Sequence, residues 1–156
     1  MTIRRSAAAV GAVALGLFAL SACTKPTPLA TVTVGKTSVH TEAACYNNGQ
    51  PLKQADFTKC LNSTPSETVD VSSGDTVHVG VDPAIADKGW VVVVDQQGAS
   101  GRLTSTYHTF SPDLVNQFFT DSSTGQQKTK VTLTIVENSS AQSYQGVWHF
   151  ALQLKG

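Results

Sequence analysis

The sequence predicts an all-β protein, an immunoglobulin-like antiparallel β-sandwich with one or two short helices. Three observations predict this class. Val and Thr are abundant, with 16 Val and 18 Thr among residues 23–156, and β-branched residues favour pleated, half-buried strands. Apolar and polar residues alternate in several short runs, which is the period of a strand with one buried face. Turn-forming residues separate these runs at the spacing of a sandwich.

The first part of the chain contains five predicted strands. Most of them alternate valines with small or polar residues, and they are separated by turns such as Gly35-Lys36. The last of the five, Trp90 to Val94, is apolar throughout and is expected to be a central strand covered on both faces. The five predicted strands cover 31–34, the segment from Val39 toward Cys45, 69–71, 76–81 and 90–94.

A helix and three more strands are predicted in the second part. Ser111 suits an N-cap and Pro112 the first helical position, so a helix of one or two turns is expected to begin there. It is expected to turn inward Leu114, Val115, Phe118 and Phe119. The predicted strands are 103–110, 131–135 and a last one that places Trp148, Phe150, Leu152 and Leu154 on one face. The Cys-Trp-Cys pattern of antibody domains is absent from the sequence, so only the architecture is implied.

The N-terminus has the features of an export signal. Arg4 and Arg5 precede an apolar and small-residue stretch from Ala7 to Leu20, which matches the charged and apolar regions of a secretory signal. Leu20-Ser21-Ala22-Cys23 then resembles the lipobox of bacterial lipoproteins, in which the cysteine receives a diacylglyceryl group and a peptidase cuts before it. The resemblance implies a lipidated Cys23 that holds the protein on the extracytoplasmic face of the cell membrane without spanning it.

This interpretation divides the chain into three parts. Residues 1–22 form a lipoprotein signal peptide, 23–29 the lipidated cysteine and a Pro-containing tether, and 30–156 the sandwich domain. The alternative is an ordinary signal peptide that happens to meet a cysteine. The arginine pair suggests twin-arginine export, but the residues after it lack the bulky apolar side chains usual for that route. Twin-arginine export and the general secretory route therefore both stay open.

Removal of the signal peptide changes the charge balance. The full chain carries 11 basic and 11 acidic residues. Without Arg4 and Arg5, 9 basic residues remain against 11 acidic ones, a formal charge of −2. This charge balance argues against a nucleic-acid-binding protein and against a protein that a polybasic segment holds on a membrane surface. The expected partners are the membrane, through Cys23, and an envelope protein or ligand.

Cys45 and Cys60 remain as a pair in an exported and therefore oxidising setting, which predicts a disulfide between them. Pro51 occupies a plausible first helical position within the enclosed segment. The apolar residues that follow are expected on the inner face of a short helix: Leu52, Phe57, Cys60 and Leu61. The alternative is a metal site or a redox dithiol. The spacing between Cys45 and Cys60 does not favour it, because it is not that of a CxxC motif.

Enzyme motifs are missing from the sequence. Gly98-Ala99-Ser100-Gly101-Arg102 lacks the last glycine of the G-x-S-x-G elbow of serine hydrolases. The carboxylates of Asp82, Asp87 and Asp95 flank predicted turns, where they are expected to support loops and solubility. No enzymatic activity and no cofactor is therefore predicted.

The four histidines are candidate metal ligands only in principle. They are His40, His78, His108 and His149, and no two lie at metal-ligand spacing. His78 and His149 fall on the predicted outward faces of their strands. Surface histidines without a metal are therefore predicted, and a small metal- or ligand-binding envelope protein stays as an alternative. A blue-copper site would need a cysteine in the C-terminal hairpin, and 147–150 contains none.

Three segments, 25–35, 44–47 and 80–90, together resemble a family of uncharacterised actinobacterial lipoproteins. The resemblance extends over nearly the whole mature chain. It implies a lipoprotein with a cysteine pair and a β fold, and it supplies neither an activity nor catalytic residues.

A fainter resemblance is to chagasin-like inhibitors of cysteine peptidases, in which three loops at one end of a sandwich enter the protease cleft. Gly74-Asp75 precedes a strand, and Lys88-Gly89-Trp90 holds the place of a following loop. The sequence departs from that family where Gln145-Gly146-Val147-Trp148 replaces its Arg-Pro-Trp loop. The structural alternative is that Gly89 allows a turn and Trp90 packs in the core.

The sequence thus predicts a membrane-anchored, non-enzymatic binding module at the cell envelope. Peptidase inhibition and metal or small-ligand binding remain as alternatives. The candidate binding residues are Asp82, Lys88, Gly89 and Trp90.

Overall fold

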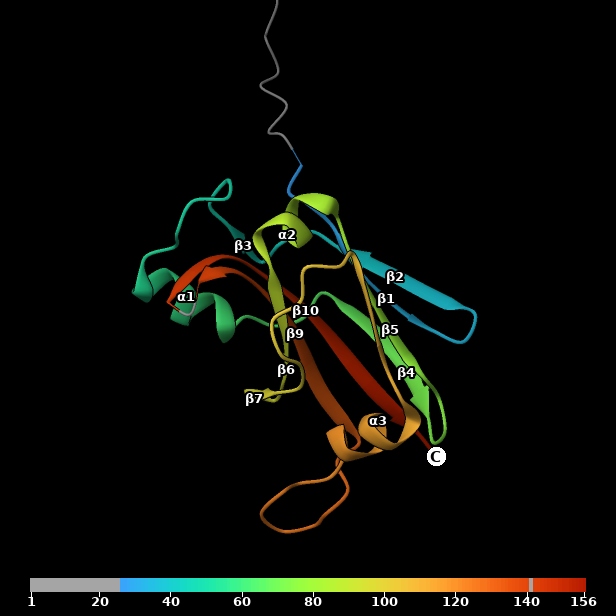
Figure 1. Cartoon of the computed structure of the whole chain (residues 1–156). Coiled ribbons are helices and arrows are strands. Elements are labelled where there is room, and N and C mark those ends of the chain that lie inside the picture. The colour runs from blue at the N-terminus through green and yellow to red at the C-terminus, as the bar shows by residue number, and fades with distance from the viewer. Residues whose placement is uncertain (1–25, 141) are drawn as a thin grey trace, which may run out of the picture.

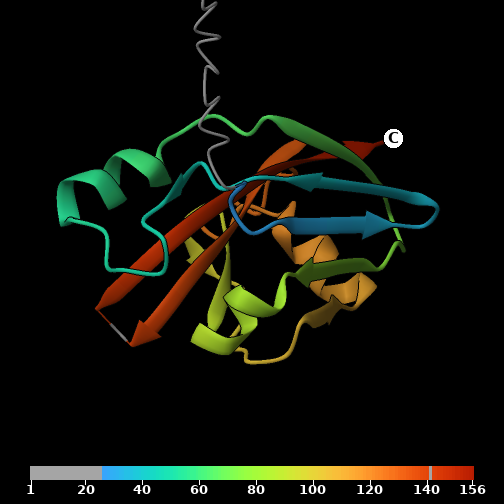
Figure 2. The same ribbon diagram turned by 90° about the horizontal axis from the view of Figure 1, so that it is seen from above.

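The predicted all-β sandwich is confirmed by a computed structural model, in which residues 26–140 and 142–156 are described. Two β-sheets pack face to face over a common core (Figures 1 and 2). The described residues form eight strands of four or more residues and two strands of two residues. The predicted signal peptide and Cys23 lie outside the described residues.

The first sheet has the strand order β2-β1-β5-β8 and is antiparallel throughout. Its strands are β1 (Ala30–Val34), β2 (Thr37–Thr41), β5 (Val77–Val81) and β8 (Tyr107–Phe110). In β1 and β5 the buried residues alternate with half-buried ones, as the sequence predicts for strands with one face on the core. The predicted strand 103–110 is shorter, because only its last four residues pair with β5.

The second sheet has the order β3-β10-β9-β6-β7, and β4 also pairs with β10. Its strands are β3 (Cys45–Tyr46), β4 (Glu67–Ser72), β6 (Trp90–Val94), β7 (Gln97–Gly98), β9 (Lys130–Ser140) and β10 (Ser143–Lys155). The pairing of β4 with β10 is parallel, so this sheet departs from the purely antiparallel arrangement that the sequence predicts. The sandwich class is shown, and the immunoglobulin-like assignment stays a prediction.

Aromatic and branched side chains from both sheets fill the core. Trp148, Phe150 and Leu152 of β10 are fully buried on one face, as predicted, and Leu154 packs against the same core. In β6 only Trp90, Val92 and Val94 are buried and the two valines between them are half-buried. The second face of this strand is therefore covered less completely than its apolar sequence predicts.

Three short helices cover parts of the sandwich: α1 (Gln54–Leu61), α2 (Pro83–Lys88) and α3 (Pro112–Phe118). Helix α1 lies in the segment between the two cysteines, and it begins at Gln54 rather than at the predicted Pro51. Its Phe57 and Cys60 are buried, with Leu52 and Leu61 packed beside them. Helix α2 was not predicted. Pro83 begins it, since the fixed φ of proline suits a first turn.

The strand register places α2 and α3 at opposite ends of the sandwich. Ala30, which begins β1, pairs with Val81, and α2 follows directly. At the other end, Val34 pairs with Val77, and Val77 pairs with Phe110, which α3 follows. Figure 1 shows the chain entering beside α2, with α3 at the far end. Within the described ranges, no helix is long and apolar enough to cross a membrane.

Candidate functional site

The predicted binding segment lies at the α2 end. Asp82 precedes α2, and its carboxylate accepts a hydrogen bond from the Leu29 backbone N–H at 2.8 Å, so its loop-supporting role is confirmed. Trp90 is fully buried, and its Nε1 donates to the Ser105 carbonyl at 2.8 Å. Trp90 therefore has the core-packing role that the sequence left open, and it offers no surface to a ligand. Lys88 is exposed.

Gly89 is required by the turn from α2 into β6. Its φ of 94° lies in the left-handed region, which favours glycine. The guanidinium of Arg102 occupies the space that a Cβ at this position would need. Arg102 donates hydrogen bonds to the carbonyls of Lys88 and Asn138. A side chain at position 89 would displace this arginine, which joins three segments of the chain.

Glu137 is the most unusual residue of the α2 end. It lies in β9 between Trp90 and Gly146, it is 0% exposed, and neither carboxylate oxygen has a hydrogen-bond partner among the described residues. Burial raises the pKa of Glu137 to about 7, and the nearby charge of Lys88 acts in the opposite direction. Burial, and then the charge of Glu137, raise the pKa of Tyr46.

A chagasin-like tip would need the segments around Gly89, Gly101 and Gly146 at one end of the sandwich, and all three lie at the α2 end. Gly89 contacts Arg102, next to Gly101, and Glu137 pairs with both Trp90 and Gly146. However, Gly89 and Gly146 are buried, and a Cβ at Gly146 would collide with the ring of Trp148. Two of the three segments are therefore packed into the structure, and only the one at Gly101 is exposed.

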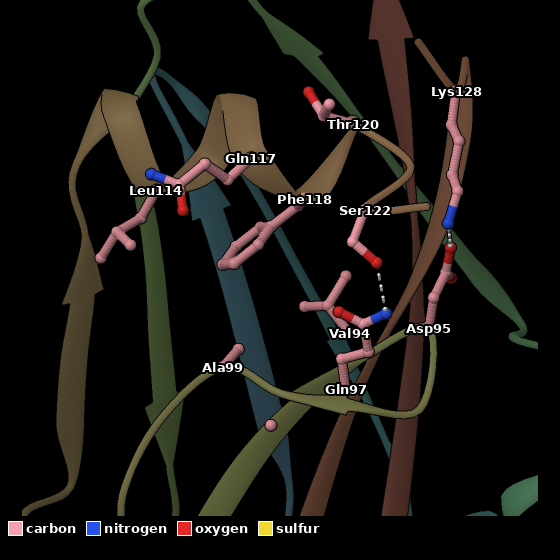
Figure 3. A pocket seen from close by; sticks show the side chains of 11 residues that line it. Val94, Asp95, Gln97, Ala99, Leu114, Gln117, Phe118, Thr120, Ser122 and Lys128 are labelled. Carbon is pink, nitrogen blue, oxygen red and sulfur yellow. Dashed lines mark hydrogen bonds and ion pairs between the residues drawn. The ribbon is translucent and has the colours of Figure 1, made fainter. Parts of the chain in front are cut away.

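A groove of about 330 Å³ lies at the opposite end, between α3 and the β6–β7 hairpin (Figure 3). We call it the α3 groove. Phe118 and Leu114 of α3 face Val94 and Ala99 across it, with Gln97 and Gln117 at its sides. The prediction that Leu114 points inward is wrong, because this side chain is 43% exposed. Val115 and Phe119 are buried as predicted. The core-facing side of this segment therefore includes one residue fewer than the sequence predicts.

Hydrogen bonds hold the rim of the α3 groove in place. Asp95 has a φ of 46° and the next residue one of 67°, the pair of left-handed residues that a tight hairpin turn needs. The Asp95 carboxylate accepts from the Thr132 backbone N–H at 2.8 Å and pairs with Lys128 at 3.0 Å. The Gln97 side chain donates to Ser122, as Figure 3 shows. The charges at the rim are therefore paired with each other.

The loop that carries Ser122 has its own organising residue. The carboxylate of Asp121 accepts hydrogen bonds from the hydroxyls and backbone N–H groups of Ser123 and Thr124. These bonds hold the pKa of Asp121 well below its usual range. Asp121 also lies 3.8 Å from Lys128, which connects the loop to the rim of the groove.

The prediction for His149 is wrong. This side chain is buried, because α1 covers the outer face of β10 at this point. Its Nε2 donates to the Cys60 carbonyl at 2.7 Å and its Nδ1 accepts from the Thr134 hydroxyl at 2.9 Å. Burial lowers the pKa of His149. His149 is thus a buried, hydrogen-bonded part of the structure beneath α1, and its burial favours the neutral form.

The predicted disulfide between Cys45 and Cys60 is confirmed, with the two Cα atoms 5.9 Å apart. It ties α1 to β3, the short strand paired with β10. Among the residues that the structure describes, no group of three His, Cys, Asp or Glu side chains is arranged to hold a metal ion.

No known protein family, curated protein or solved structure matches the chain. The resemblance to actinobacterial lipoproteins therefore stays a prediction. The sequence predicts neither the burial of Glu137 nor the α3 groove. The groove had one available signal, an apolar Leu114 on a helix too short to bury all four of its large apolar residues.

Proposed function

We infer that the protein is a lipid-anchored extracytoplasmic lipoprotein, held on the cell membrane by Cys23, that acts as a non-enzymatic binding module at the envelope. The anchor rests on the lipobox resemblance at Leu20-Ser21-Ala22-Cys23. Two acyl chains give stable attachment, since each buried methylene contributes about 0.8 kcal/mol.

The observation that carries the binding role is the separation of the two ends of the sandwich. The chain enters at the α2 end, where Trp148 Nε1 donates to the Pro28 carbonyl at 2.8 Å. The Leu29 N–H is bound by Asp82. Only two residues lie between Cys23 and Pro26. A fully extended chain spans the distance from Cys23 to Pro26 in roughly 10 Å.

A short tether at the α2 end has a geometric consequence. The lipid would hold the α2 end close to the bilayer and leave the α3 groove, at the opposite end, open to the envelope. The groove combines an apolar floor of Val94, Ala99 and Phe118 with amide groups and paired charges at its sides. Apolar surface with a few fixed polar groups is the usual character of a ligand site.

The anchor is tested by replacing Cys23 with Ser. We expect the wild-type protein in the membrane fraction of the cell and Cys23→Ser in the soluble extracytoplasmic fraction, because only the wild type can be acylated. Thr68→Ser, at an exposed position of β4, is the control, since it leaves Cys23 and the disulfide unchanged and should stay with the membrane. Equal membrane association of the wild type and Cys23→Ser would contradict the anchor.

The binding role of the α3 groove is tested by photo-crosslinking in intact cells. A photoreactive residue at Leu114, on the lip of the groove, is expected to give a discrete adduct, whereas one at exposed Thr68 of β4 should not. Filling the groove with Ala99→Leu should reduce the adduct at position 114. The same adducts at both positions, or none at position 114, would remove the support for this site.

A further inference from the structure

The outer face of the first sheet is a second surface with a distinct chemistry, at a site that the proposed anchor and groove do not involve. The register of β2, β1, β5 and β8 aligns its outward residues in two rows across the four strands. One row is Ser38, Thr33, His78 and Thr109, and the other is His40, Thr31, Gly80 and Tyr107. We call this surface the hydroxyl face.

The hydroxyl face carries no Asp, Glu, Lys or Arg. Charged residues lie just beyond the ends of these strands, namely Lys36, Glu42, Asp75 and Asp82. The Asp82 carboxylate accepts a hydrogen bond from the Leu29 N–H. A surface without cations does not suit nucleic acids or anionic polymers, whose binding depends on Lys and Arg. The face also has no large apolar side chain other than one tyrosine. It therefore differs in composition from the apolar centre of a stable protein interface.

The polar groups of the face are held in position by contacts with each other. The Thr33 and Ser38 hydroxyls lie 2.8 Å apart, and His78 Nδ1 lies 3.1 Å from the Thr109 hydroxyl. The Tyr107 hydroxyl also contacts His78. Each hydroxyl has one donor and two acceptor positions, so these groups keep hydrogen-bonding capacity toward solvent. The face therefore offers fixed donors and acceptors without charge.

Tyr107 adds an aromatic platform, and Gly80 beside it leaves a gap in its row of side chains, which we call the notch. Tyr107 is 54% exposed, and its ring stacks on that of His78 with centroids 5.6 Å apart. Gly80 pairs with Tyr107 on one side and with Thr31 on the other, and it has no side chain of its own. The atoms nearest to a Cβ at this position would be Thr31 Cβ at 3.8 Å and the Thr106 carbonyl oxygen at 3.9 Å. A flat ligand that carries C–H groups on one surface and hydroxyls at its edge matches this arrangement, because an aromatic face attracts partial positive charge.

We propose that the hydroxyl face binds a neutral polysaccharide chain, with one sugar ring seated against Tyr107 over Gly80. Neighbouring hydroxyls of the chain then exchange hydrogen bonds with Thr31, Thr33 and Thr109 across the strands. The match of an uncharged, hydroxyl-lined surface to an uncharged, hydroxyl-rich polymer selects this partner over charged ones. The proposal does not depend on the lipid anchor, and the two can fail separately.

The test is affinity electrophoresis of the purified Cys23→Ser chain through native gels that contain galactomannan, mixed-linkage β-glucan or arabinogalactan, with polygalacturonate as the anionic comparison. We expect at least one neutral polysaccharide to retard the protein and polygalacturonate to leave it unaffected. Tyr107→Ala and Gly80→Val should each weaken the retardation about tenfold. Thr68→Val on β4 of the other sheet is the matched control and should bind like the parent.

Gly80→Val keeps the test independent of folding. A Cβ at Gly80 would lie 3.8 Å from Thr31 Cβ, an ordinary contact, and valine suits a strand, so unfolding temperature should be unchanged while the notch is filled. No retardation by any of the three neutral polymers, retardation by polygalacturonate alone, or retardation that both variants leave intact would overturn the proposal. So would a dimer of the purified chain that Tyr107→Ala dissociates, because the face would then bind a second copy.

Discussion

Glu137→Gln is expected to stabilise the protein at pH 8 by up to about 3 kcal/mol and to have little effect at pH 4. The reason is that the folded protein holds Glu137 with a pKa of about 7 against a usual value of 4.5, and each pKa unit corresponds to about 1.4 kcal/mol. A raised pKa means that the folded state binds the proton more tightly. The contribution of Glu137 to stability is therefore fully present below pH 4.5 and is lost as the pH rises through 7.

The measurement is urea unfolding of the wild type and Glu137→Gln at several pH values between 4 and 8. Only the difference between the two proteins is compared, since other titrating groups such as His149 contribute equally to both. Glu42→Gln, at an exposed position, is the matched control and should show no such pH-dependent difference. If the difference in unfolding free energy between the wild type and Glu137→Gln stayed constant from pH 4 to 8, it would contradict the burial of an unpartnered carboxylate at the α2 end.

Removal of the disulfide, by Cys45→Ala together with Cys60→Ala, is expected to cost about 3 kcal/mol of unfolding free energy. The bond closes a segment with a sequence separation of 15, for which chain entropy predicts this magnitude. The structural loss should be local, because Phe57 of α1 stacks on Tyr144 of β10 with ring centroids 4.0 Å apart. The α3 groove, at the other end, should keep its structure.

Denaturant unfolding and hydrogen exchange check this prediction together. We expect a lower unfolding midpoint and faster exchange in α1 and β3, while amides of β1 and β5 stay protected in the native state. Reducing the wild-type protein with a thiol should reproduce the effect, and the double variant should not respond to that reductant. An unchanged midpoint in both cases would show that the segment is held by packing alone.

Much of the fold could be predicted because its signals are local. Alternating valines fix which face of β1 and β5 is buried, and a proline after serine marks the start of α3. The parallel pairing of β4 with β10 could not be predicted, since no local pattern records which distant strand becomes a neighbour. His149 was misplaced for a related reason: its outward face is covered by α1, which the disulfide and Phe57 bring from far away in the sequence.

The candidate sites were less accessible to prediction. Asp82, Lys88 and Gly89 were singled out, and they do lie together at the α2 end, but the arrangement is mainly structural. Glu137 gave no signal in the sequence, because a glutamate at the start of the polar segment 137–146 looks like a surface residue. Tyr46 and Lys88 of α2 lie close enough to Glu137 to interact with its charge, and only the tertiary structure brings them there.

Mass spectrometry of the N-terminal peptide of the membrane-extracted protein tests the proposed anchored module most directly. We expect a peptide that begins at Cys23 and carries a diacylglyceryl group on its sulfur. A mature N-terminus upstream of Cys23, or an unmodified thiol at that position, would contradict it.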